Sequence, residues 1–221
     1  MKRHRITMVA TAVGALLFLL TLGAPLASAD SISYTLSNSN LGSGFTGPFG
    51  TVNVSLSGST ATITFTAGSG YVFLDGSIGD LNINGTWSLG TVTGITCATA
   101  GCDGSFGNVD GFGTFNQTIN SKAGFGSAVT SFSFTITETG TTNWGSAAGV
   151  LFANSTGGHV AAHIAPTSLG GACTGFASDG TTSSTTPPGG CAGTVPDGGV
   201  TLMLLGGALV GIETLRRKFR V

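Results

Sequence analysis

The chain has 221 residues, of which 38 are glycine and only 8% are charged, against about a quarter in a typical globular protein. Seven of its eight basic residues lie within the first five or the last six positions, so Lys122 alone accompanies the acidic residues of the long middle segment, which are Asp30, Asp75, Asp80, Asp103, Asp110, Glu138 and Asp179. Nucleic-acid binding requires clustered Lys and Arg that replace the counterions of phosphate, and this segment offers no such cluster.

Residues 1–29 predict a secretory signal peptide with an N-terminal signal helix. Three basic residues among the first five precede an apolar run over residues 6–22. Ala27 and Ala29 then form a small-x-small cleavage site, so we expect the mature chain to begin at Asp30. The alternative is an uncleaved membrane anchor. Export would bring the four cysteines into an oxidising compartment where they can pair.

Residues 30–170 alternate apolar with Ser or Thr positions, a period of two that indicates strands. The alternating apolar positions are Ile32, Tyr34, Leu36, Val52, Val54, Leu56, Ile63, Phe65, Leu81, Ile83, Trp87, Leu89, Phe115, Ile119, Phe132, Phe134 and Ile136. Residues 57–60 predict a hairpin turn between two of these strands. The 14 phenylalanines favour a folded core over the disorder that Gly and Ser richness alone would suggest. We predict an all-β ectodomain, an antiparallel β-sandwich of jelly-roll-like type.

The four cysteines fall into two local pairs. Cys97 and Cys102 bracket a short loop, and Cys173 and Cys191 bracket a stretch rich in Gly, Ser, Thr and Pro. Four cysteines allow three pairings, and proximity in the sequence favours Cys97–Cys102 with Cys173–Cys191 as a hypothesis. Because the hydrophobic alternation fades near residue 170, residues 171–194 are predicted to be a disulfide-bridged linker.

Two histidines, His159 and His163, have the i, i+4 spacing that places imidazoles on one face of a helix in zinc enzymes. The residue after the first of them is Val160, so the usual general base is absent, and the flanking residues favour a strand. On a strand the two rings would lie about 13 Å apart, too far to share one ion. We therefore favour ordinary, partly exposed histidines over a zinc site.

Two segments contain the acidic and amide residues of calcium loops. Residues 80–85 begin as such a loop does, but the position of the bidentate Glu is Thr91, and Leu81 with Ile83 alternates as a strand would. Residues 101–111 form a second acidic, Gly-rich loop, interpreted as a turn. A structural calcium ion is the less favoured alternative in both segments, so no cofactor is expected.

Residues 195–221 combine three features in a fixed order. An apolar run over residues 200–215 separates a short motif from a basic cluster; the motif is Val195, Pro196, Asp197, Gly198 and Gly199, and the cluster is Arg216, Arg217 and Lys218. The apolar run would span about 24 Å as a helix, close to the ~30 Å of a bilayer core, with the basic cluster as a cytoplasmic stop. A transmembrane helix is expected here.

This tripartite tail resembles the PEP-CTERM sorting signal of Gram-negative bacteria in its V-P-D-S-G-like variant, with Asp197 for the usual Glu and Gly198 for the second Pro. The resemblance implies an exosortase-type membrane transpeptidase as a partner. That enzyme would cut near the motif, so the protein would be anchored transiently in the inner membrane and then moved to the cell surface or the extracellular matrix. The alternative is a plain C-terminal anchor without processing.

No nucleophile elbow, carboxylate pair or phosphate loop stands out in the chain, so we predict that it is not an enzyme. The expected function is a structural or adhesive role at the cell surface or in the exopolysaccharide matrix, with extracellular polysaccharide as a second partner. The alternative is a carbohydrate-binding module that recognises sugars through exposed aromatic residues such as Trp87 and Trp144.

Overall fold

The computed structural model describes residues 30–104, 106–122, 124–182 and 191. The residues before the predicted signal cleavage site, residues 183–190 and 192–194 of the predicted linker, and the whole sorting signal lie outside these residues. Within the described part of the chain, no helix is long and apolar enough to cross a membrane.

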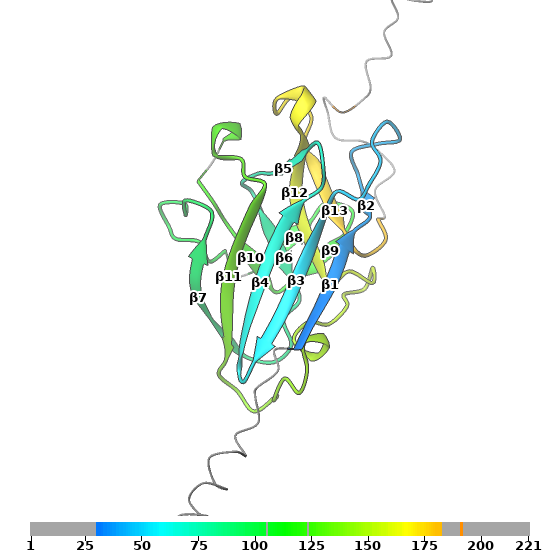
Figure 1. Ribbon diagram of the computed structural model, residues 1–221. Helices are drawn as coiled ribbons and strands as arrows, with labels where there is room; N and C mark the ends of the chain where they lie inside the picture. The colour runs from blue at the N-terminus through cyan, green and yellow to red at the C-terminus, as the bar shows by residue number, and fades with distance from the viewer. Residues whose placement is uncertain (1–29, 105, 123, 183–190, 192–221) are drawn as a thin grey trace, which may run out of the picture.

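The described residues form two antiparallel sheets that pack face to face as a β-sandwich (Figure 1). Sheet A has the strand order β1-β3-β4-β11-β7; its strands are β1 (Asp30–Leu36), β3 (Gly50–Ser57), β4 (Thr60–Ala67), β11 (Ser131–Glu138) and β7 (Trp87–Thr93). Sheet B has the order β10-β6-β12-β13-β2; its strands are β10 (Gln117–Ile119), β6 (Gly79–Leu81), β12 (Val160–Pro166), β13 (Gly175–Ser178) and β2 (Asn38–Ser39), and β5 (Tyr71–Phe73) pairs with β12. The all-β prediction is confirmed.

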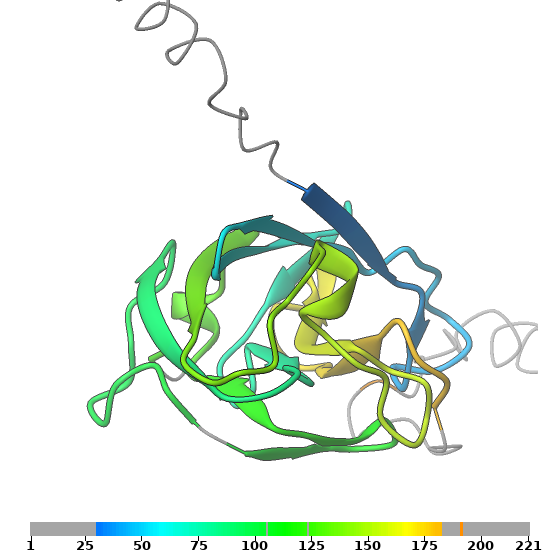
Figure 2. The same cartoon turned by 90° about the horizontal axis from the view of Figure 1, so that it is seen from below.

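A short hairpin lies outside sheet B and forms a partial third layer (Figure 2). Its strands are β8 (Gly107–Val109) and β9 (Gly113–Phe115). It buries Val109, Phe112 and Phe115 against the β12 residue Ala161. The remaining elements are short 3-10 helices, η1 (Phe125–Ser127), η2 (Ala147–Gly149) and η3 (Thr167–Leu169).

The predicted alternation accounts for the main core between the sheets. Val52, Val54 and Leu56 of β3 are buried while the residues between them are exposed or partly exposed. Phe65 and Phe132 stack there with ring centroids 4.7 Å apart. The predicted turn is also present, because Ser57 pairs with Thr60 and Gly58 between them has a φ of 60°, which glycine adopts without strain.

The folded domain extends beyond residue 170, where the sequence predicts the linker to begin. Strand β13 lies inside the predicted linker and pairs with both β12 and β2. Asp179 and Thr181 are also hydrogen-bonded to the domain. The sequence misses this strand because Gly175–Ser178 has only one large apolar side chain, Phe176, and alternation over so short a segment is too weak to read.

Candidate functional site

An open groove runs along the free edge of β7, where an edge of sheet A lies beside an edge of sheet B. It encloses about 570 Å³, and its lining residues come from β7, from the loop that Cys97 and Cys102 bracket, and from β10; they are Trp87, Ser88, Leu89, Gly90, Val92, Cys97, Ala100, Gly101, Cys102, Asp103 and Gln117. The groove therefore combines an aromatic ring, an amide, a carboxylate and the backbone of an edge strand.

Hydrogen bonds connect the polar side chains of the groove. The Trp87 indole Nε1 donates to Gln117 Oε1 at 3.0 Å. Gln117 Nε2 donates to Asp103 Oδ1 and to the backbone oxygen of Thr118, both at 2.9 Å. Gln117 is only 3% exposed, so its amide is fixed by partners on both sides. It holds the half-buried Trp87 ring in one orientation in the groove and leaves Asp103 exposed.

The edge strand β7 carries a bulge that alters its backbone beside the groove. The register between β7 and β11 shifts between Phe134 and Ile136. Gly90 lies at this shift, and a Cβ there would come within 2.3 Å of Thr135 Oγ1. A bulge bends an edge strand and interrupts its regular hydrogen-bonding pattern, which is a common protection against pairing with a further strand. The groove is therefore poorly suited to an extended peptide.

A disulfide fixes the opposite wall of the groove. Cys97 and Cys102 are bonded, as are Cys173 and Cys191, so both predicted pairings are confirmed. Cys102 also accepts a backbone hydrogen bond from Asn120 at 2.8 Å. Because Asp103 follows Cys102 directly, the disulfide and this backbone bond together determine where its carboxylate stands.

Asp80, the first residue of one predicted calcium segment, is a buried strand residue of β6. Its Oδ1 accepts a 2.7 Å hydrogen bond from Thr118 Oγ1, and its Oδ2 has no partner. Burial raises the pKa of this carboxyl to about 7, although the hydrogen bond from Thr118 and the Ser77 hydroxyl act in the opposite direction. The strand interpretation of Leu81 is confirmed, and among the described residues no cluster of His, Cys, Asp and Glu is suited to hold a metal ion.

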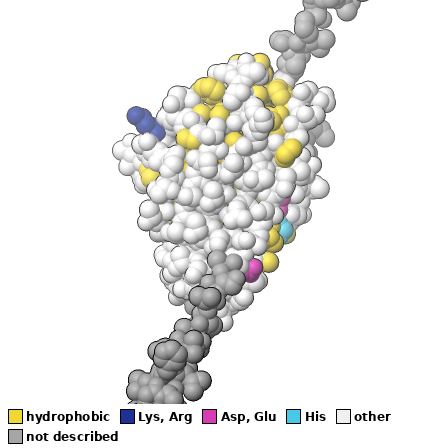
Figure 3. All heavy atoms as spheres, viewed as in Figure 1, with side chains coloured by type: hydrophobic (Ala, Val, Ile, Leu, Met, Phe, Trp, Pro, Cys, Tyr) yellow, Lys and Arg dark blue, Asp and Glu magenta, His cyan; other side chains and the backbone are white. Residues whose placement is uncertain are grey.

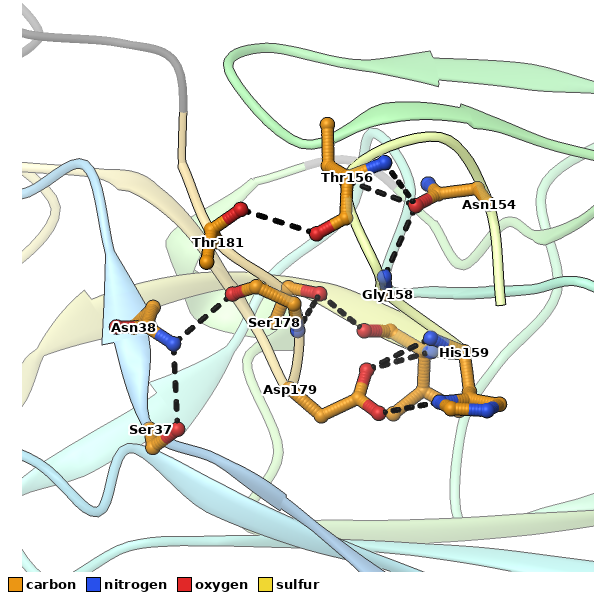
Figure 4. A network of polar contacts seen from close by, with 11 residues as sticks. Ser37, Asn38, Asn154, Thr156, Gly158, His159, Ser178, Asp179 and Thr181 are labelled. Carbon is orange, nitrogen blue, oxygen red and sulfur yellow. Dashed lines mark hydrogen bonds and ion pairs between the residues drawn. The ribbon is translucent and has the colours of Figure 1, made fainter. Parts of the chain in front are cut away.

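His159 lies beside β1 in a compact polar cluster (Figure 4). Its Nδ1 and a carboxylate oxygen of Asp179 are 2.8 Å apart. The other carboxylate oxygen accepts the backbone N–H groups of His159 and Val160 at 2.8 and 3.0 Å. The His159 ring packs on Tyr34 with centroids 4.8 Å apart, and burial together with the charge of Asp179 raises the pKa of Tyr34.

His163 has different surroundings from His159. Its Nδ1 donates to the backbone oxygen of Asp75, and its ring stacks on Phe176 at 4.8 Å. Burial lowers the pKa of His163 against the opposing influence of Asp75. Both histidines are partly exposed, as predicted, and each is occupied by its own neighbours.

Trp144 is not an exposed aromatic residue, and the prediction that it could contact a sugar is wrong. It is 3% exposed, and its Nε1 donates to the backbone oxygen of Asn84 at 2.8 Å. The sequence around it is rich in Gly, Ser and Thr and gives no periodicity from which burial could be read. Sequence reasoning did not identify Gln117 as a site residue. An isolated glutamine gives no signal of a site, and only the fold places it beside Trp87.

A comparison of the chain with models of protein families, with curated proteins and with solved structures finds no match in any of the three. The basis for assigning a function is therefore the geometry and chemistry of the described residues together with the motifs of the sequence.

Proposed function

We propose that the protein is a secreted cell-surface or extracellular-matrix protein with an adhesive role, and that its jelly-roll-like sandwich binds polysaccharide in the groove beside β7. The observation that carries this proposal is the Trp87–Gln117–Asp103 chain of hydrogen bonds in an open groove. The proposal combines the surface role with the carbohydrate-binding alternative. Trp87 is the aromatic residue that contacts the sugar, and Trp144, which is buried, has no part in it.

The chemistry of a sugar suits these three side chains. A pyranose ring has an apolar face of C–H groups that packs on an indole, and hydroxyls at its rim that donate to a carboxylate. Trp87 is held in place by Gln117 before any ligand arrives, so little side-chain entropy is lost on binding. Asp103 offers acceptor oxygens on the rim, where water-mediated and direct hydrogen bonds both contribute. No catalytic role is proposed for these residues.

The proposed cellular location of the protein is based on sequence motifs outside the described residues. The signal peptide would direct export, and the PEP-CTERM-like tail would bring the chain to an exosortase at the inner membrane and then to the surface or matrix. Two disulfides in so small a domain are compatible with an oxidising compartment. The segment after residue 182 would act as a spacer between the sandwich and its attachment point.

Binding to immobilised glycans tests the groove. The full chain is offered dextran, laminarin, hydroxyethyl cellulose and alginate, and we expect at least one neutral glycan to bind. Trp87→Ala should weaken that binding by tenfold or more, about 1.4 kcal/mol, because it removes the aromatic platform. Trp144→Phe is the matched control, since it changes a buried tryptophan and should leave binding unchanged. Binding that is indifferent to Trp87, or absent for every neutral glycan, would overturn the proposal.

Processing is tested separately in the producing cell. Pro196→Ala removes the preference for an extended backbone that proline imposes on Val195, and we expect it to slow removal of the C-terminal segment. Immunoblotting for a C-terminal epitope tag measures the rate of this removal. If cleavage proceeds unchanged after deletion of the host's exosortase, another protease reads the tail. If the C-terminal tag is never lost, even in the unchanged host, the tail is a plain anchor without processing. Either result leaves the glycan-binding experiment interpretable.

A further inference from the structure

The outward face of sheet A carries only small uncharged polar side chains over four neighbouring strands. Its outward positions are Ser31, Ser33 and Thr35 of β1, Thr51, Asn53, Ser55 and Ser57 of β3, Thr60, Thr62, Thr64 and Thr66 of β4, and Ser131, Ser133, Thr135 and Thr137 of β11. The inward positions between them form the core. The sheet thus separates a largely apolar face from a face of hydroxyl groups and the Asn53 amide.

Strand register arranges these side chains in rows. One row runs through Ser33, Asn53, Thr64 and Ser133, which are successive Cα partners across β1, β3, β4 and β11. Neighbours in a row lie about 4.8 Å apart, and rows on one face repeat about every 6.7 Å along the strands. Some neighbours touch directly, as Asn53 Nδ2 and Ser33 Oγ do at 3.1 Å. The face is therefore a regular grid of hydroxyl and amide groups.

The grid contains no charged side chain, and Figure 3 shows charges only at the margins of this view. High β-propensity explains why threonine is common in these strands. The edge strand β1 also lacks, at its outward positions Ser31, Ser33 and Thr35, the Lys and other charged residues that usually protect a sheet edge. An anionic polymer would find no cation here. A second copy of the chain would find no apolar centre of the kind that stable protein interfaces bury. A neutral polymer rich in hydroxyls matches the face in both respects.

The face is continuous with the groove. Strand β7 forms the groove wall and is also the last strand of sheet A. Ser88 lines the groove and is the register partner of Thr137 in the grid. At the other end of the strand, Thr93 Oγ1 lies 2.9 Å from Ser133 Oγ. A polymer held at Trp87 would therefore leave the groove beside the outward hydroxyls of β11, the grid strand that pairs with β7.

We propose that the outward face of sheet A is a second contact surface for neutral polysaccharide, which holds the part of the polymer that extends beyond the groove. This inference rests on the proposed glycan binding in the groove. Each hydroxyl contact replaces a hydrogen bond to water and contributes little by itself. Many such contacts along one tethered polymer act at high effective concentration, so the face contributes to the binding of long chains and not of short ones.

The experiment compares short and long forms of one sugar on the full chain. The probes are cellohexaose with hydroxyethyl cellulose, laminarihexaose with laminarin, and isomaltohexaose with dextran. We expect the polymer to bind at least tenfold more tightly than the hexasaccharide per mole of chain ends. The double variant Thr62→Val/Thr64→Val keeps the shape and strand propensity of both residues while removing their hydroxyls. It should bind the polymer severalfold more weakly and the hexasaccharide as the unchanged protein does.

Thr114→Val is the matched control, since Thr114 is an exposed strand residue of the β8–β9 hairpin on the other side of the molecule; it should change neither affinity. Equal affinities for polymer and hexasaccharide, or a double variant that binds the polymer normally, would overturn the inference while leaving the groove intact. Loss of self-association in the double variant, measured by sedimentation, would assign the face to a second copy instead. Trp87→Ala without effect on either probe would refute the groove proposal, on which the inference depends.

Discussion

The sandwich has two lateral sides, one beside β1 and one beside β7, and each carries an aromatic ring, a nitrogen donor and a carboxylate. Beside β1 the carboxylate of Asp179 is 13% exposed and interacts with three nitrogens of the 159–160 segment, under the ring of Tyr34. Beside β7 the residue Asp103 is exposed while its Oδ1 accepts a hydrogen bond from Gln117, and an open groove lies along Trp87. The same groups close the side where the acid is mostly buried and leave an open groove on the side where the acid is exposed.

A third carboxyl, that of Asp80, is buried in β6 next to the edge strand β10 on the side of the groove. Its replacement should produce the largest expected change in the free energy of unfolding. Its pKa is raised from 3.8 to about 7 in the folded chain, so its contribution to stability is complete below pH 3.8 and is lost as the pH rises through 7. The full loss is on the order of 4 kcal/mol. Asp80→Asn should remove this dependence and make the protein more stable than the unchanged chain at pH 8.5, measured by urea unfolding across pH 4 to 9.

Ser77→Ala serves as a control for Asp80→Asn, because Ser77 lowers the pKa of Asp80 and its loss should raise that pKa further. A variant Asp80→Asn whose unfolding free energy follows the same pH curve as the unchanged protein would show that Asp80 titrates normally. Burial of the Asp80 carboxyl would then not affect its ionisation.

The closed side should depend strongly on its acid, and the open side should not. Asp179→Ala removes a charged acceptor from two backbone N–H groups and from His159, and we expect the unfolding free energy to fall by about 3 kcal/mol. Asp103→Ala is the matched change at an exposed acid. It removes the hydrogen bond that Asp103 accepts from the buried Gln117, and we expect a smaller loss of about 1 kcal/mol. Chemical denaturation at pH 7 measures both. Similar losses for the two variants would contradict the proposed difference between the sides.

The disulfide of the open side should affect both stability and binding. Cys97→Ser/Cys102→Ser opens a loop with a sequence separation of 5, which corresponds to about 2 kcal/mol of unfolded-chain entropy. Because the loop fixes Asp103, the same variant should also weaken glycan binding. The pair Cys173 and Cys191 closes a longer loop, with a separation of 18. Its replacement should cost about 3 kcal/mol with no change in affinity for glycans, which makes it the control.

The sequence predicted those parts of the fold that repeat. Two-residue alternation identified β3, β4 and β11 because each is eight residues long and buries one face. Alternation failed to identify β13, which has only four residues. The sequence also led us to expect an exposed Trp144, although this side chain is buried and donates a hydrogen bond to Asn84, 60 residues away. Local periodicity contains no information on contacts between distant segments, so exposure of an isolated aromatic residue cannot be read from it.

The candidate site was predicted only in fragments for the same reason. Trp87 and Asp103 were both singled out, but as members of different features, and Gln117 had no signal at all. The three meet because β7 and β10 are the edge strands of two different sheets, a relation that topology determines and that alternation does not. The observed disulfide pairing was one of the three that four cysteines allow, and proximity in the sequence favoured it as a hypothesis.

The smallest expected effect concerns the ring that covers the closed side. Tyr34→Phe keeps the packing on His159, so the unfolding free energy at pH 7 should change by less than about 0.5 kcal/mol. The pKa of Tyr34 is raised, first by burial and then by the charge of Asp179, so ionisation of its hydroxyl opposes folding above pH 10. The Phe variant should therefore resist alkaline unfolding better than the unchanged chain. Absorbance of tyrosinate tests this directly, because Tyr71 is then the single remaining tyrosine. If Tyr34 instead ionises at an ordinary pH, the side beside β1 is as open to water as the side beside β7, and the contrast between them must come from the groove alone.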